Sequence, residues 1–144
     1  MVLIVEPDDD VALRLTASLD RVEDVRRCRS FDDAREQLRR SPPDLLVGNL
    51  RLGEYNGLHL VYLAGNAGSP MRAIIYTTTL DIVLARDVQR AGAFYDTADC
   101  LEVSLRAYLG TPLPPSDRRD PQRRLRLEKP AGRRLTDFMD ASER

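Results

Sequence analysis

Short apolar runs alternate with helical patterns along residues 1–110. The run Val2-Leu-Ile-Val5 is continuous and rich in β-branched residues, which is typical of a strand buried on both faces of a sheet. Similar runs predict strands at 2–5, 45–49, 73–77 and 93–96, and residues 22–28 are a further strand candidate with a less continuous apolar pattern. Five strands alternating with helices in about 110 residues predict an α/β protein with a doubly wound, parallel, five-stranded sheet.

Capping and stop signals mark the helices between these strands. Asp8 or Asp9 can cap the first helix, and Ser30-Phe-Asp-Asp33 has the spacing of a capping box. Gly92 is a good end for the fourth helix. Helices are expected after residue 9, from 30 to the Pro42-Pro43 pair, near 58–62, and at 81–91 and 101–109. Tyr76 and Phe94 are expected in the sheet core.

The carboxyl ends of the predicted strands carry most of the candidate chemistry. In open α/β sheets, ligands bind in the crevice beyond these ends. The residues placed there are Glu6–Asp8, Asn49–Gly53, Thr77–Thr79 and Asp96–Asp99.

Several segments together resemble a known family. They are Val2–Asp8, Pro43–Leu52, Asn56-Gly57, Ala73–Thr77 and Ala91–Ala93. In order and interval they are similar to the receiver domain of two-component response regulators. The resemblance covers residues 1–110 and implies a flavodoxin-like (βα)5 fold.

The resemblance also implies a chemistry, and this sequence departs from it. The family phosphorylates an aspartate after the third strand, holds Mg²⁺ with two acids after the first, and contacts the phosphoryl group with a Ser/Thr and a Lys. The corresponding residues here are Asn49, the pair Glu6 and Pro7, Thr77 and Asp99. An amide is a poor nucleophile, and Pro7 has no ligand atom in its side chain.

A degenerate phosphorylation site is therefore predicted, formed by Glu6, Pro7, Asp8, Asn49, Thr77 and Asp99. The chain has no lysine before Lys129, so the lysine is missing however the segments are matched to the family. Asp8 and Asp99 are expected to cap helices rather than hold a cation. No catalytic residue, no resident metal and no cofactor is predicted, with weak Mg²⁺ binding as the alternative.

The resemblance places a partner-binding face on the fourth helix, fifth strand and fifth helix. Its mixed charges suit a homodimer with reciprocal Arg–carboxylate pairs. The family's aromatic switch position falls on Asp96, with Tyr95 one residue earlier. The face is expected to consist of Arg86, Arg90, Tyr95, Asp96, Glu102 and Arg106.

Charge and composition divide the chain in two. Residues 1–110 have a net charge of −4, and residues 111–144 have a net charge of +3. Thr111-Pro-Leu-Pro-Pro115 is a stiff, helix-stopping join, so a domain at 1–110 and a Pro/Arg-rich extension at 111–144 are expected. The extension is partly disordered or a short helix in this interpretation, and it suits protein docking better than nucleic acid.

Other features exclude whole classes of protein. No apolar run approaches the ~18 residues of a membrane span, and the N-terminus lacks the features of a signal peptide. Cys28 and Cys100 have neither metal-ligand spacing nor a disulfide framework, which favours reduced thiols and a cytoplasmic location.

The expected function is phosphorylation-independent signalling by protein contact, with a histidine kinase, a phosphotransfer protein or another regulator as partner. The protein is not expected to be an enzyme. One alternative is a conventional phosphorelay receiver, but the nearest acid, Asp44, lies at the other end of its strand, about 16 Å from Asn49 at ~3.3 Å per residue. Another is a flavodoxin-like sensor of a small molecule or anion, with Thr77–Thr79 as a hydroxyl-rich candidate.

Overall fold

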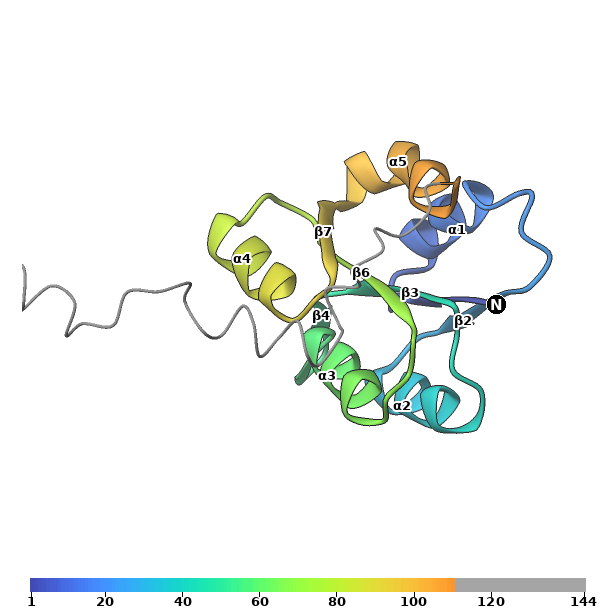
Figure 1. The fold of residues 1–144 in the computed structure, drawn as a ribbon. Helices are drawn as coiled ribbons and strands as arrows, with labels where there is room; N and C mark the ends of the chain where they lie inside the picture. Colours follow the sequence, from blue (N-terminus) through green and yellow to red (C-terminus); the bar gives the residue numbers. More distant parts are fainter. Residues whose placement is uncertain (111–144) are drawn as a thin grey trace, which may run out of the picture. The chain divides into compact units, whose positions relative to one another are not determined.

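The computed structural model describes residues 1–110, and the expected extension at 111–144 lies outside the described residues. The strands of the main sheet alternate with helices along this part of the chain (Figure 1). The elements are β1 (Val2–Val5), α1 (Asp9–Ala17), β2 (Val25–Cys28), α2 (Phe31–Arg40), β3 (Leu45–Asn49), β4 (Arg51–Leu52), β5 (Tyr55–Asn56), α3 (Leu58–Asn66), β6 (Arg72–Thr77), α4 (Ile82–Arg90), β7 (Phe94–Thr97) and α5 (Ala98–Gly110).

Five strands form one parallel sheet in the order β2-β1-β3-β6-β7. The predicted doubly wound α/β fold is therefore confirmed. β1 lies between β2 and β3, and all four of its residues are buried, as the continuous apolar run predicted. Parallel strands place all their carboxyl ends at one edge of the sheet, which is where the candidate site must lie.

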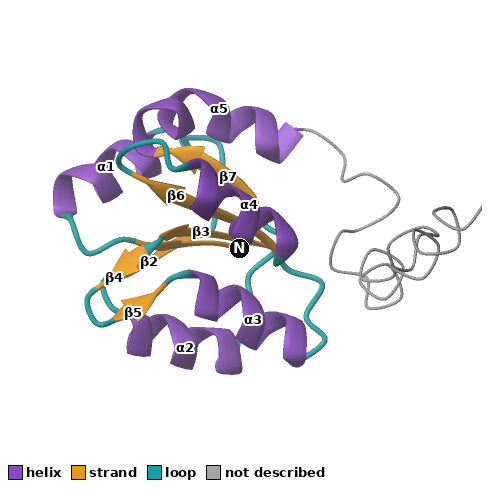
Figure 2. Ribbon diagram, turned by 90° about the vertical axis from the view of Figure 1, so that its left-hand side faces the viewer, coloured by secondary structure: helices purple, strands orange, loops and turns teal. Residues whose placement is uncertain are grey.

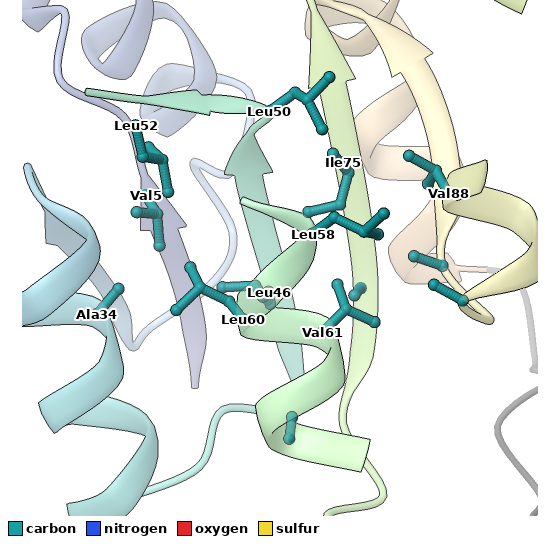
Figure 3. Close-up of a cluster of buried hydrophobic side chains, with 14 of the residues drawn as sticks. Val5, Ala34, Leu46, Leu50, Leu52, Leu58, Leu60, Val61, Ile75 and Val88 are labelled. Atoms are coloured by element: carbon teal, nitrogen blue, oxygen red, sulfur yellow. The ribbon is translucent and has the colours of Figure 1, made fainter. Parts of the chain in front are cut away.

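Two hydrophobic cores lie on opposite faces of this sheet. Alternate residues of β1 divide between them, with Leu3 and Val5 in one core and Val2 and Ile4 in the other. The first core packs β-strand side chains against α2, α3 and α4 (Figure 3), and the second packs them against α1 and α5. Figure 2 shows the resulting three layers, with α2 and α3 side by side beneath the sheet.

The helix caps follow the sequence signals. The Asp8 carboxylate accepts from the backbone N–H groups of Asp10 and Val11, so Asp8 rather than Asp9 caps α1. The Ser30 hydroxyl accepts from the N–H of Asp33 at the start of α2, as the capping-box spacing predicted. Asp81 caps α4 in the same way.

Three local expectations were wrong or incomplete. The segment after β3 forms a small antiparallel hairpin, β4–β5, where only a turn was predicted. α5 begins at Ala98 rather than 101, so Asp99 lies in its first turn and is not its cap. β2 is shorter than the predicted 22–28 segment, because its pairing register with β1 begins at Val25.

Candidate functional site: a closed carboxylate cluster at the strand ends

Glu6 is the central residue of the candidate site. It follows β1 directly, and it is 1 % exposed, the one buried charged residue among residues 1–110. Its Oε1 accepts from the N–H of Asp8 at 2.8 Å, and its Oε2 accepts from Asn49 Nδ2 at 3.0 Å and from the Tyr76 hydroxyl. A buried carboxylate needs such donors, because burial removes its water. Glu6 is thus fully engaged within the domain.

Asn49 holds the end of β3 in this cluster. Its Nδ2 donates to Glu6, and its Oδ1 accepts from the N–H of Arg51 at 2.9 Å. The two ends of the amide therefore have different partners: the nitrogen donates a hydrogen bond and the oxygen accepts one. A carboxylate at this position would place a second negative oxygen about where the amide N–H now meets Glu6.

Glu6, Asn49 and Tyr76 form the Glu6 cluster. Of these three residues, Tyr76 was expected only as a core residue. It is buried as predicted, but its hydroxyl donates to Glu6. The β3–β6 pairing sets Tyr76 opposite Asn49, which brings both side chains to the same carboxylate. Burial, together with the neighbouring Glu6 carboxylate, raises the pKa of Tyr76 far above its usual value. The one signal in the sequence was a tyrosine directly after the aliphatic run Ala73-Ile-Ile75, since a buried hydroxyl requires a partner.

The Thr77 hydroxyl is also occupied. It donates to the carbonyl of Thr79 at 2.7 Å and hydrogen-bonds the Tyr95 hydroxyl. Tyr95 in turn accepts from the N–H of Asp81 at 3.0 Å, so the start of α4 is tied to β7. Thr77 keeps the hydroxyl that the resemblance implied, but its bonds run toward the β6–α4 connection.

Tyr95 and Asp96 are adjacent in β7 but have different neighbours. The Tyr95 hydroxyl hydrogen-bonds the Thr77 hydroxyl. Asp96 instead turns toward α5, where its carboxylate accepts from the Ser104 hydroxyl at 2.8 Å. Partial burial and the nearby Asp96 carboxylate raise the pKa of Tyr108.

The remaining predicted site residues do not join Glu6 in a metal site. Asp8 is exposed and engaged as a cap, Pro7 offers a backbone carbonyl to Arg27, and Asp99 is exposed on α5. No three carboxylate, His or Cys groups among residues 1–110 come together as metal ligands would. With both Glu6 oxygens already engaged, the residues present do not fit the Mg²⁺ that the resemblance implied.

A small polar pocket of about 210 Å³ opens beside this cluster. It brings together Asn49 and Thr77, two of the predicted site residues, and adds Arg51, which was singled out only as part of a strand end. Arg51 is exposed and forms no ion pair within the described part of the chain. The full lining is Asn49, Arg51, Thr77, Thr78, Thr79, Asp81 and Leu84.

The expected partner-binding face is divided by the structure. Glu102 pairs with Arg14 at 2.6 Å and Arg106 with Asp20 at 2.6 Å, so both α5 residues lie against α1 and its following turn, away from α4. Arg86 and Arg90 remain exposed on α4. Sequence periodicity could not have predicted the direction of Glu102 and Arg106, because it identifies a polar side of α5 but not the element that this side contacts.

An exposed apolar patch at the start of α4 was not predicted. It consists of Leu80, Ile82 and Val83, which are 70 %, 62 % and 68 % exposed. The three side chains flank Asp81, which lines the polar pocket and caps the helix. The patch therefore adjoins the candidate site.

Known proteins match this chain in structure. No protein-family model and no curated protein matches the sequence. Solved structures do match: the signal receiver domain of a DNA-binding response regulator from Colwellia psychrerythraea aligns with 19 % identity and a TM-score of 0.66, over 76 % of this chain and 98 % of that one. The chain has the receiver-domain fold.

Two further structures support this fold. A protein assigned as a response regulator from Chloroflexus aurantiacus has 25 % identity and a TM-score of 0.65, with 76 % of this chain and 97 % of that one covered. The response regulator domain of Thermotoga maritima CheB has 17 % identity and a TM-score of 0.64, with 75 % and 91 % covered. Within residues 1–110, no helix has the length and apolar character that crossing a membrane requires.

Proposed function

We propose that this receiver-like domain signals by protein contact and without phosphorylation. The observation that carries the proposal is the bonding of Glu6 to Asn49 and Tyr76. In a receiver that accepts phosphate, the residues at these strand ends would have to present a carboxylate nucleophile and a metal site. Here they bond to one another, and Asn49 supplies an amide in place of the nucleophile.

A closed cluster favours one conformation. Thr77, Tyr95 and Asp81 link β6, β7 and α4 by hydrogen bonds, so the start of α4 is fixed without any ligand. A surface held in one shape can bind a partner continuously, and no covalent step is needed to create it. The domain is then a binding module rather than an enzyme.

The contact surface we propose is the exposed side of α4. The apolar patch Leu80, Ile82 and Val83 continues into Arg86 and Arg90. An apolar centre with charged residues beside it is the usual composition of a protein-binding surface. The partner is a histidine kinase, a phosphotransfer protein, another regulator or a second copy of this chain.

The test of the chemistry is an amide NMR spectrum with Mg²⁺ and beryllofluoride, which mimics a phosphoryl group on aspartate. We expect no shifts at Glu6, Asn49 and Thr77, while a receiver that has the aspartate, run in parallel, shifts strongly. Saturable shifts at these residues, or labelling by a phosphoryl donor, would contradict the proposal.

The test of the contact uses purified candidate kinases, phosphotransfer proteins and the chain itself as partners. Ile82→Asp should weaken binding strongly, because it places a charge in the centre of the patch. Leu13→Asp is the matched control, since Leu13 is also a highly exposed apolar residue but lies on α1. If both variants lose binding equally, or if neither loses binding, α4 is not the contact surface.

Anion sensing is the second candidate, and the polar pocket favours it. Arg51 lines this pocket together with hydroxyl-bearing Thr78 and Thr79. The same NMR experiment separates the two functions, since inorganic phosphate alone would shift Arg51 and Thr78 if the pocket binds anions.

A further inference from the structure

A second cavity lies between α2 and α3, which run side by side beneath the sheet (Figure 2). Its volume is about 520 Å³, within the ~300–1,000 Å³ range of small-molecule sites. We call it the α2–α3 groove. Its lining consists of Arg35, Leu38, Arg39, Pro42, Leu63, Ala64, Ala67, Ser69 and Pro70.

The groove is at the opposite end of the sheet from the Glu6 cluster. Helices that follow parallel strands run back toward the amino ends of those strands. Pro42 stands between the end of α2 and the start of β3, and Pro70 stands between the end of α3 and the start of β6. The groove therefore belongs neither to the candidate site nor to the α4 surface.

Small residues late in α3 explain why the two helices leave space there. Ala64 and Ala67 line the groove three residues apart, on one face of the helical turn, and offer no side chain long enough to reach α2. Leu38 of α2 packs only partly against the core, and Leu63 is 41 % exposed. The wall is thus apolar and incompletely covered by the protein's own side chains.

The charged groups that line the groove are both cationic. Arg35 pairs with Asp32 at 3.0 Å and Arg39 with Glu36 at 2.9 Å, but neither carboxylate lines the groove. Both pairs are exposed, and exposed pairs contribute little, so either guanidinium can turn to a new carboxylate at small cost. Guanidinium groups bind carboxylates through two parallel hydrogen bonds.

We propose that the α2–α3 groove binds a small organic carboxylate with an aliphatic body. The apolar wall takes the aliphatic part, and Arg35 and Arg39 take the carboxylate. The inference does not depend on the proposed function, because it uses no residue of the Glu6 cluster or of α4.

The first test is an amide NMR titration of the full chain with dodecanoate below its micelle concentration. We expect saturable shifts confined to Leu38, Leu63 and Ala67 and their neighbours. Dodecyltrimethylammonium has an alkyl chain of nearly the same length with the opposite charge, and it should bind roughly two- to fivefold more weakly. Equal binding of the two amphiphiles, or shifts scattered over the surface, would overturn the proposal.

Three variants locate the site and its charge preference. Ala67→Phe should abolish the shifts, because Ala67 is exposed at the end of α3 and a phenyl ring there fills the groove. Arg39→Gln should weaken dodecanoate binding roughly two- to fivefold. Arg40→Gln is its matched control, since Arg40 also pairs with Glu36 but does not line the groove.

Each outcome decides the question. Loss in Ala67→Phe together with a larger effect of Arg39→Gln than of Arg40→Gln supports the proposal. Unchanged binding in Ala67→Phe places the ligand elsewhere, and equal effects of the two arginine variants remove the carboxylate contact. Thermal unfolding of Ala67→Phe, measured alongside, shows whether the loss of binding arises from unfolding instead.

Discussion

At the scale of single residues, the Tyr76 hydroxyl is one of three donors that hold the buried Glu6 carboxylate. We expect Tyr76→Phe to lower the free energy of unfolding by about 1.5–3 kcal/mol, the usual contribution of a hydrogen bond to a charged group. The phenyl ring keeps the packing of β6, so the loss reports the hydrogen bond. Urea unfolding monitored by circular dichroism measures it.

The control for this variant is Tyr62→Phe. Tyr62 lies on α3, is 43 % exposed, and is expected to change stability by less than about 0.5 kcal/mol. If the two variants cost the same, Glu6 does not depend on Tyr76. A double-mutant cycle with Asn49→Ala would then show whether the Glu6 cluster acts as a unit.

Asp9 gives a residue-scale prediction for pH. Its hydrogen bond with Arg27, and the charge of Arg29, lower the pKa of the Asp9 carboxyl below its usual value. A depressed pKa in the folded state means that this carboxylate stabilises the protein above its unfolded pKa, and that the effect is lost as pH falls through the folded pKa. We therefore expect Asp9→Asn to be destabilising at pH 7 and neutral at the acid end of the curve.

The matched control for Asp9 is Asp10→Asn. Both acids lie in the first turn of α1 and interact alike with the helix dipole, but the Asp10 carboxylate forms no ion pair within residues 1–110. The difference between the two variants therefore compares the Arg27 and Arg29 contacts of Asp9 with the Coulombic interaction of Asp10 with Arg14. Unfolding curves over a pH series check it, and an equal pH dependence of both variants would contradict the prediction.

At the scale of elements, Gly57 sets how closely α3 approaches the end of β3. A Cβ built at Gly57 would lie 2.2 Å from the Asn49 carbonyl oxygen, so the backbone must move to accept any side chain. We expect Gly57→Ala to cost about 1–3 kcal/mol by overpacking and to shift the Asn49 amide resonances. Gly110→Ala, where a Cβ meets nothing within 4 Å, should be near neutral in the same unfolding assay.

The elements that could be predicted are those with a strong local signal. The sheet strands other than β2 were visible as apolar runs, and Asp8, Ser30 and Asp81 mark helix starts that side-chain caps confirm. The β4–β5 hairpin was missed because two-residue strands are too short to show a period. Its stability comes instead from tertiary contact, since Tyr55 stacks on Phe31 of α2 at 4.4 Å between ring centroids.

The candidate site was predictable in position but not in bonding. The rule that ligands bind beyond the carboxyl ends of parallel strands located Glu6, Asn49 and Thr77 correctly at one edge. It could not show that Glu6 is buried, because that depends on Tyr76 and Asn49 arriving from two other strands. The direction of Glu102 and Arg106 toward α1 was hidden for the same reason, as it is set by helix packing.

At the scale of the whole molecule, the closed Glu6 cluster predicts that stability is independent of divalent cations. A ligand that binds only the folded state stabilises it by RT ln(1 + [L]/Kd), which is about 2.7 kcal/mol at 100 times Kd. For a domain of this size that would raise the unfolding midpoint by several degrees. We expect no such rise with Mg²⁺, because both Glu6 oxygens already accept hydrogen bonds and Pro7 offers no side-chain ligand.

Asn49→Asp sharpens this test, because it sets a second carboxylate beside Glu6 and removes a donor. We expect the variant to lose about 1–3 kcal/mol without metal, and Mg²⁺ to restore little of it, since the missing ligand at Pro7 is not replaced. Gln89→Glu makes the same amide-to-carboxylate change at an exposed position of α4 and should leave the midpoint nearly unchanged. Full recovery of Asn49→Asp by Mg²⁺ would mean that this edge of the sheet still forms a metal site, and would contradict the prediction that the residues around Glu6 do not fit the ion.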